Sequence, residues 1–462
     1  MSSCLTTNSV RLSYKSREEK DNSRILVSLA LLWASLSVQA TSSYAASPDD
    51  AHPSGESSSA QSADPVLQWN KNLLEIVRTA GAQPATVHPT RSFAIMHAAI
   101  YDAVNAIDGK HEPYLVDLTA VSKSASQGAA AAAAAHEVLV NLYPKFQSTL
   151  DSELQQSLAH IPNGTAKDDG VSIGQSVADQ LLALRSNDGS NAPPLPYVYG
   201  SAPGDYQSTP PNFPKQPQFT HWSGVRPFAL KSADQFRPAP PPALTSDEYS
   251  DAFNEVRALG IANGTAASSD EALTGRFWNG AIQNYWNEIT QAVATEHKLT
   301  TAKSARLFAL LNVTFADGVI AFYDAKYTYN IWRPVTAIRA ANSDGNPDTN
   351  TDPNWLPEVG NTTPDPSYPG AHAVISAAGA SVLTSFFKKD RFDFTVTSEV
   401  LPGVTRSFTS FSAADEEATL SRIFAGVHFR SDLIVGQQLG SKVADFVVDN
   451  FLTPLHGDKD RD

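Results

Sequence analysis

The sequence predicts an all-α protein in which two helical bundles are joined by an irregular, proline-rich crossover. Apolar residues recur at intervals of three and four over several long segments, which is the spacing of an amphipathic helix. Only residues 391–411 show the alternation of apolar and polar residues that is typical of a strand. Prolines interrupt the chain repeatedly between residues 189 and 245, where no helix can continue. Together these patterns favour the packing of helix on helix.

The composition is that of an ordinary globular protein. Of the 462 residues, 42% are hydrophobic and 18% are charged. The net charge of -14 is unfavourable for binding nucleic acid or an anionic membrane surface, so an anion site would have to be a local basic cluster. The single cysteine, Cys4, lies in a segment that we expect to be removed, which excludes disulfides and thiolate metal sites from the mature chain.

The first 46 residues have the order of a secretory signal peptide. Basic residues up to Arg24 precede an apolar run over Ile25–Val38, and small residues follow up to Ala46. The run is short for a membrane span, and no second run of membrane length is evident. We therefore expect a secreted or periplasmic protein with no membrane association after processing. Residues 47–63, rich in Ser, Ala, Asp and Pro, are expected to form a flexible linker.

Residues 64–188 are expected to form the N-terminal helical bundle. Apolar residues follow helical spacing along Pro89–Ile107, and Pro89 suits a first helical turn. The run Ala129–Ala135 favours a helix that can pack closely against its neighbours. Further helices are expected over Leu67–Thr79, Phe146–His160 and Asp168–Leu184.

Residues 189–245 are expected to be an ordered crossover, because aromatic residues are interleaved with the prolines. Residues 246–455 are expected to form the C-terminal bundle. Its first helices are predicted over Ser246–Leu259 and from a capped start at Ser268. A long helix is predicted from Thr300 or Thr301 towards Lys326.

Three stretches of the C-terminal bundle carry side chains that suit an oxyanion. Lys326 and Arg333 are seven residues apart, so they would share a face if the long helix continued. The aromatic residues around them argue for burial, and buried cations need an anionic partner. The second stretch, Pro369-Gly370-Ala371-His372, combines a turn, a histidine and a helix start whose N–H groups attract anions.

The third stretch contains Arg422, His428 and Asp432. Arginine offers a planar fork of donors to phosphate-like oxygens. A histidine can give one nitrogen to a metal or phosphorus centre while a carboxylate fixes the other. Gly426 is expected to let the chain turn so that Arg422 and His428 face one anion. Asp432 would also suit the start of a helix over Leu433–Phe451.

In this order, Lys-x6-Arg-Pro, Pro-x-x-His and Ser-Arg-x5-His-x3-Asp resemble the motifs of the superfamily of vanadium-dependent haloperoxidases and type-2 phosphatidic acid phosphatases. The resemblance implies that the equatorial oxygens of vanadate, or of phosphate in its place, are neutralised by Lys326, Arg333 and Arg422. It also implies that the amides of Gly370 and Ala371 add donors.

For the remaining motif residues, the resemblance implies acid–base and ligand roles. His372 would be the acid–base group near the apical oxygen. His428 would bind vanadium, or attack phosphorus as a nucleophile, and Asp432 would orient it.

The middle motif departs from the family pattern Pro-Ser-Gly-His, because Gly370 replaces the serine. The loss of one hydrogen bond to a charged ligand costs about 1.5–3 kcal/mol, roughly ten- to hundredfold in affinity. We expect a weakened oxyanion site. Asp365 stands seven residues before His372, at the position that influences halide choice in the family, and a carboxylate there would repel a halide.

Vanadate resembles phosphate, so the motifs fit two chemistries. A haloperoxidase oxidises halide with hydrogen peroxide at a histidine-bound vanadate, and its partners are hydrogen peroxide, halide and an organic acceptor. An acid phosphatase of this superfamily hydrolyses phosphomonoesters through a phosphohistidine. Chain length, predicted export and the additional bundle favour the haloperoxidase. A third alternative, suggested by Gly370, is a relative that binds an oxyanion without catalysis.

Overall fold

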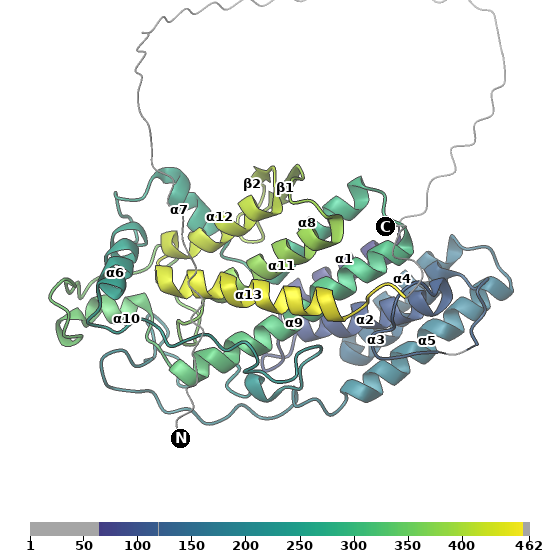
Figure 1. Ribbon diagram of the computed structural model, residues 1–462, viewed down its shortest axis with the longest axis horizontal. Coiled ribbons are helices and arrows are strands. Elements are labelled where there is room, and N and C mark those ends of the chain that lie inside the picture. The colour runs from purple at the N-terminus through teal and green to yellow at the C-terminus, as the bar shows by residue number, and fades with distance from the viewer. Residues whose placement is uncertain (1–63, 119, 456–462) are drawn as a thin grey trace, which may run out of the picture. The chain divides into compact units, whose positions relative to one another are not determined.

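The computed structural model describes residues 64–118 and 120–455, all within one compact unit. The predicted signal peptide and linker lie outside the described residues. The described chain is mostly helical, which confirms the all-α prediction (Figure 1). Compact structure begins at Asp64, whose side chain accepts a hydrogen bond from the Val66 amide and caps the first helix.

The first half contains five α-helices with bounds close to those predicted from apolar spacing: α1 (Pro65–Arg78), α2 (Pro89–Asp108), α3 (Gln127–Leu142), α4 (Gln147–Ala159) and α5 (Thr165–Arg185). A 3-10 turn, η1 (Pro144–Phe146), precedes α4. Pro89 starts α2 as expected. Its fixed φ suits the first turn, and the N–H that proline lacks would have no intrahelical acceptor at this position.

Residues 186–246 form an irregular segment whose one short helical turn is η2 (Trp222–Gly224). It is fastened to the helices by a buried carboxylate. Asp317 accepts hydrogen bonds from the successive amides of Phe228, Ala229 and Leu230. Backbone groups outside regular structure need such partners when they are buried, so this contact explains how a proline-rich segment remains ordered.

The second half contains α6 (Asp247–Leu259), α7 (Ser269–Phe277), α8 (Ile282–Glu296), α9 (Thr301–Tyr329), α10 (Pro334–Arg339), η3 (Ala341–Ser343), α11 (Ala371–Phe387), α12 (Phe411–Phe424) and α13 (Arg430–Asn450). The strands β1 (Phe394–Thr397) and β2 (Thr405–Phe408) pair antiparallel, with Phe394 opposite Phe408. This hairpin falls within the one stretch where the sequence showed alternation.

Helix α9 is the central helix of the described chain. It packs against α2 of the first half and against α11 and α13 of the second, and Figure 1 shows it running between these groups. It is also long and apolar enough to cross a membrane, with a mean hydropathy of 1.5, contrary to the expectation that no such run follows the N-terminus. Of its apolar window, 94% is buried inside the protein, which accounts for its composition as that of a core helix.

The two halves repeat one close helix contact. In the first half, Gly170 and Gly174 of α5 face the backbone at α3. A Cβ added to Gly170 would lie 2.5 Å from Ser126 O, and one added to Gly174 would lie 2.3 Å from Ala130 O. In the second half, Gly436 and Gly440 of α13 face α11 at comparable distances. Because a side chain would not fit at these positions, glycine allows the helix backbones to touch.

Candidate functional site

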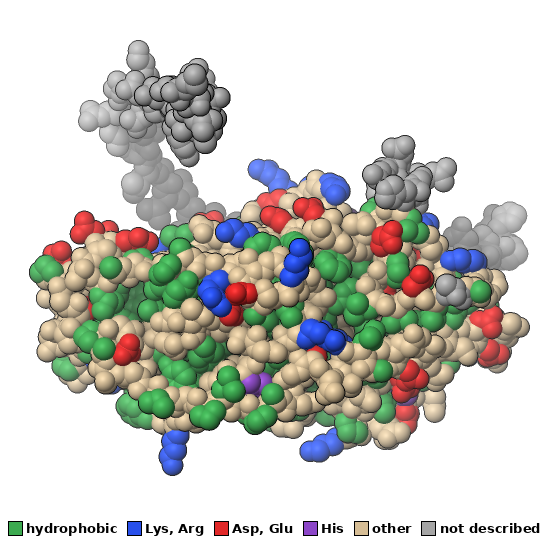
Figure 2. Space-filling view, turned by 60° about the horizontal axis from the view of Figure 1, so that its bottom comes forward, with side chains coloured by type: hydrophobic (Ala, Val, Ile, Leu, Met, Phe, Trp, Pro, Cys, Tyr) green, Lys and Arg blue, Asp and Glu red, His purple; other side chains and the backbone are tan. Residues whose placement is uncertain are grey.

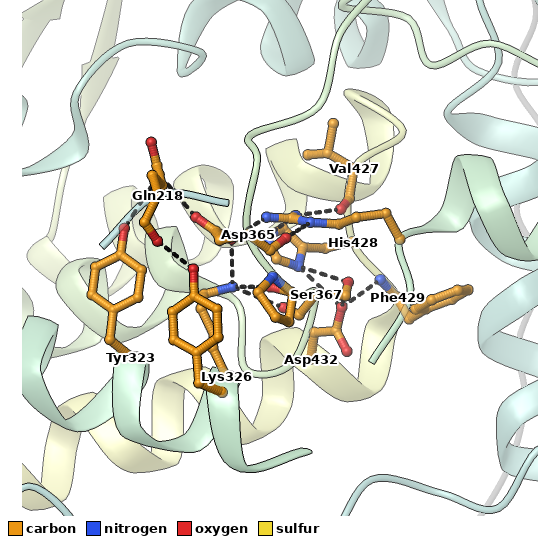
Figure 3. Close-up of polar contacts among 12 residues, drawn as sticks. Gln218, Tyr323, Lys326, Asp365, Ser367, Val427, His428, Phe429 and Asp432 are labelled. Carbon is orange, nitrogen blue, oxygen red and sulfur yellow. Dashed lines mark hydrogen bonds and ion pairs between the residues drawn. The ribbon is translucent and has the colours of Figure 1, made fainter. Parts of the chain in front are cut away.

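Lys326 and Arg333 meet, but not on one helical face. Helix α9 ends at Tyr329, and Asn330 follows in the left-handed conformation with φ 52°. Arg333 therefore lies at the start of α10, so the condition for a shared face, a helix that continues past Lys326, is not met. The two cations are joined by Asp365, whose Oδ1 lies 3.1 Å from Lys326 Nζ and 2.5 Å from Arg333 Nη2 (Figure 3).

The Lys326 ammonium is fully buried and uses all three of its donors within the protein. Besides Asp365, it donates to the backbone oxygens of Pro366 and Ser367. Burial lowers the pKa of Lys326 to about 8, against the raising effect of Asp365. The cation is thus held in place by the loop 365–367, which precedes α11.

Asp365 is buried and remains charged. Burial raises the pKa of its carboxyl group, but Lys326 and Arg333 outweigh this effect and bring the pKa to about 2. Its second oxygen, Oδ2, accepts a hydrogen bond of 3.0 Å from Gln218 of the crossover. The sequence placed this carboxylate near the anion site but gave no sign that two cations would neutralise it.

His428 is held in one tautomer by two neighbours. Its Nδ1 lies 3.0 Å from Asp432 Oδ2, and its Nε2 lies 3.0 Å from Arg333 Nη1. A guanidinium can only donate, so Nε2 accepts and the ring proton is on Nδ1. Burial, followed by the charges of Arg333 and Lys326, lowers the pKa of His428 well below 6.5. The ring is therefore neutral, with the Nε2 lone pair turned towards buried cations.

Asp432 lies in the first turn of α13, where it also accepts from the Phe429 amide at 3.1 Å, so the orienting and helix-start positions coincide. Its Oδ2 receives a further hydrogen bond of 2.6 Å from the Ser367 hydroxyl. Burial raises the pKa of Asp432, while Ser367 and Phe429 lower it. Sequence reasoning missed Ser367, because the only available signal was its position two residues before Pro369.

Arg422 supplies a third buried cation from the last turn of α12. It donates to Ser421 Oγ, Asn279 Oδ1 and Gly275 O, and within residues 64–118 and 120–455 no carboxylate lies within ion-pair distance of it. Burial is the main cause that lowers its pKa, and the nearby charge of Arg333 adds to it. A buried guanidinium with only neutral acceptors is suited to take up an anion.

Gly426 makes the predicted turn between Arg422 and His428. Its φ is +79°, and an added Cβ would lie 2.2 Å from Gly260 O. Only glycine fits both the left-handed backbone and this close approach.

The second predicted stretch, Gly370-Ala371-His372, is placed differently from the expectation. The Gly370 amide donates to Asp432 O at 2.9 Å, so it is committed to holding α11 against α13 and is not free for a ligand. Ala371 is the first residue of α11, and no side chain caps that helix. The early N–H groups of α11 therefore keep the donor capacity that a helix start offers to an anion.

His372 is half-buried, and its Nε2 donates to Trp278 O at 2.9 Å, so the ring is not hydrogen-bonded to the group formed by Lys326, Arg333 and His428. It still lies close enough for charge effects. The loss of contact with water is the main cause that lowers the pKa of His372 well below 6.5, and the charges of Arg422 and His428 lower it further.

The site as a whole carries an excess of positive charge inside an acidic protein. Three buried cations (Lys326, Arg333, Arg422) are accompanied by two buried carboxylates (Asp365, Asp432), which leaves one positive charge unmatched. On the face drawn in Figure 2, the described Lys and Arg side chains are scattered among acidic and apolar ones without forming a continuous basic patch. Such an interior is suited to one small anion rather than a polyanion.

Comparisons with known proteins agree with this arrangement. Residues 306–457 match a family model described as the VCPO second helical-bundle domain. The vanadium chloroperoxidase of Curvularia inaequalis is 26% identical over 492 residues, which cover 81% of this chain and 80% of that protein. A bacterial vanadium-dependent iodoperoxidase structure superposes with a TM-score of 0.71 and 27% identity, covering 84% of this chain and 96% of that one.

A bacterial vanadium-dependent chloroperoxidase in its holo form shares the fold at 15% identity, with a TM-score of 0.65 over 82% of this chain and 95% of that one. Together with the motif geometry, these findings support the superfamily of vanadium-dependent haloperoxidases and type-2 phosphatidic acid phosphatases. Its relatives within that superfamily are vanadium haloperoxidases.

Proposed function

We propose that this protein is a vanadate-dependent haloperoxidase that oxidises a halide with hydrogen peroxide. The observation that carries the proposal is the neutral His428, which turns an unprotonated Nε2 towards buried cations while Asp432 fixes its other nitrogen. A ring nitrogen with a free lone pair can bind a metal, and the carboxylate behind it sets the orientation.

The residues present fit vanadate. His428 would be the ligand through Nε2, and Arg333 would exchange its bond to that nitrogen for one to an oxyanion oxygen. Arg422 keeps two N–H groups that no described residue uses, because its three hydrogen bonds occupy one donor each. The Ala371 amide at the uncapped start of α11 adds another donor. When bound, vanadate supplies a Lewis acid that activates hydrogen peroxide towards halide.

The side chains around this centre would hold charge and move protons. Arg333 and Arg422 would balance the oxyanion charge in a buried setting, where such interactions are strongest. His372 carries a ring proton on Nε2, which it gives to Trp278 O, so its other nitrogen could accept the proton of the incoming peroxide. Its lowered pKa keeps the ring neutral and ready for that step.

A phosphatase of the same superfamily is the second candidate. The observation that favours it is the unprotonated His428 Nε2 beside the buried cations Lys326 and Arg333, which suits a phosphate group as well as vanadate. In that reaction the bound anion would favour protonation of the second ring nitrogen of His372, and His428 Nε2 attacks phosphorus. The P–O bond to the alcohol breaks with that proton from His372, and water then hydrolyses the phosphohistidine.

One experiment separates the candidates. The mature chain is incubated with orthovanadate and assayed for oxidation of iodide and bromide by hydrogen peroxide, and in parallel without vanadate for hydrolysis of p-nitrophenyl phosphate. Halide oxidation that needs vanadate and disappears in His428→Ala supports the proposal. Phosphate release that vanadate inhibits would support the phosphatase instead. Vanadate binding with neither activity would identify a non-catalytic relative.

We further propose that the protein acts outside the cytoplasm, secreted or periplasmic, because residues 1–46 have the order of a signal peptide. N-terminal sequencing of the exported protein tests this. A mature chain that begins near residue 47 is expected, and an intact N-terminus in the cell interior would contradict it.

A further inference from the structure

The buried carboxylate of Asp365 has a different role from that of Asp432. Asp432 supports His428, whereas Asp365 faces the cations and is bonded directly to two of them. Arg333 contacts this residue twice, through Nη2 to Oδ1 and through Nε to the backbone oxygen at 2.8 Å. Gln218 holds the second carboxylate oxygen at 3.0 Å, which fixes the group against rotation.

We propose that Asp365 is a specificity-determining residue of the oxyanion site, acting as a built-in negative charge that makes the site select singly charged tetrahedral oxyanions over doubly charged ones. This proposal rests on the proposed function only in taking the site to bind an oxyanion. It concerns the charge of the anion accepted, whichever reaction follows.

Charge balance gives the reason. Without Asp365, the three cations and Asp432 would leave two positive charges unmatched, which suits a dianion. With Asp365 present, one positive charge is unmatched, and a monoanion restores neutrality. An added dianion would leave the interior with a net negative charge. An unbalanced charge is costly in a buried site, so the dianion is disfavoured. Orthovanadate is mainly a monoanion at neutral pH, which agrees with this selection.

The position of Asp365 makes the effect direct. Its charge lies between Lys326 and Arg333, both 0–2% exposed, where water screens poorly. Coulomb repulsion between Asp365 and a bound anion is proportional to the charge of that anion. Removal of the Asp365 charge should therefore change the logarithm of affinity twice as much for a dianion as for a monoanion of the same shape.

Perrhenate and tungstate provide the matched probes, because both are tetrahedral oxyanions of nearly equal size and they differ by one unit of charge at neutral pH. Their affinities are measured by isothermal titration calorimetry on the full mature chain, with wild type, Asp365→Asn and Asp365→Glu. Wild type should bind perrhenate at least as tightly as tungstate. In Asp365→Asn, a gain of about tenfold for perrhenate should accompany a gain of about hundredfold for tungstate. Asp365→Glu retains the charge and should keep the wild-type preference.

Three results would overturn the proposal. One is a wild-type site that strongly prefers tungstate, and this measurement stands even if Asp365→Asn fails to fold because two buried cations lose their partner. Another is an equal gain for both anions in Asp365→Asn, which would mean that the effect of the side chain does not depend on the charge of the bound anion. The third is no gain for either.

Binding of orthovanadate by the same samples separates this proposal from the proposed function. Orthovanadate binding with no charge preference would refute the role of Asp365 alone. No binding of any of the three anions would refute the oxyanion site itself, and with it both proposals.

Discussion

Gly440 offers a sharp test of how the site is supported. Its added Cβ would lie 2.1 Å from Val374 O and 2.9 Å from Val374 C, both backbone atoms of α11. Van der Waals contact requires more than 3 Å, so Gly440→Ala forces α11 and α13 apart by roughly 1 Å. Overpacking against backbone costs about 3 kcal/mol, and alanine returns about 1 kcal/mol through helix propensity. The free energy of unfolding should fall by about 2 kcal/mol.

The matched control is Gly318→Ala in α9, which approaches the same residue of α11 from another helix. There the added Cβ would lie 3.4 Å from Val374 Cγ1, an ordinary contact. That variant should gain about 0.5–1 kcal/mol from helix propensity alone. Urea unfolding followed by circular dichroism measures both variants on the same protein.

The separation of α11 from α13 should also reach the site, because the Gly370 amide bonds to Asp432 O across this contact. Gly440→Ala should therefore weaken orthovanadate binding, and Gly318→Ala should leave it unchanged. If Gly440→Ala unfolds at the wild-type urea midpoint, or if both variants shift the midpoint in the same direction, the account of this interface is incorrect.

Three further outcomes are expected. Ser367→Ala removes the 2.6 Å hydrogen bond to the buried Asp432 carboxylate and should lower the free energy of unfolding by about 1.5–3 kcal/mol. Ser367→Thr keeps the hydroxyl and should retain most of the wild-type stability. An equal loss of stability in both variants would point to packing instead. Burial lowers the pKa of His97 to about 3, so between pH 6.5 and that value the unfolded chain binds a proton that the folded one excludes, and stability falls as pH falls. Chemical unfolding across this range should show that His97→Gln loses up to about 1.4 kcal/mol less per pH unit than wild type, and parallel slopes would contradict this. Orthovanadate at about a hundredfold excess over its dissociation constant should stabilise wild type by about 2.7 kcal/mol in thermal unfolding but not His428→Ala, and equal stabilisation would move the site elsewhere.

The sequence predicted the elements well where local chemistry decides them. Pro89 marks the start of α2, Ser268 forms a capping box with Glu271 at α7, and Thr300 caps α9. Each of these signals acts over three or four residues, so no tertiary contact is needed to read it. The positive φ of Gly426 was predictable for the same reason, because a turn was needed between two residues of one motif.

Predictions failed where residues distant in sequence decide the outcome. Helical spacing would put Lys326 and Arg333 on one face only if the helix continued, but α9 ends between them and Asp365 joins them. The Gly370 amide was expected to donate to the anion, but it donates to Asp432 O of α13. The partner of a donor or acceptor depends on which segment, distant in sequence, packs beside it. The periodicity of a sequence does not show which segment that is.

The sequence by itself thus determined the all-α class, the order of the helices and the set of charged and histidine side chains that belong to one site, because spacing, caps and motifs are local properties of the chain. The tertiary structure alone decided how those charges are balanced. It brought Asp365 between Lys326 and Arg333, placed the Ser367 hydroxyl on Asp432, and left Arg422 without a carboxylate. Burial removes the water that would otherwise screen these groups, so the exact partners of each charge, rather than its presence, set what the site can bind.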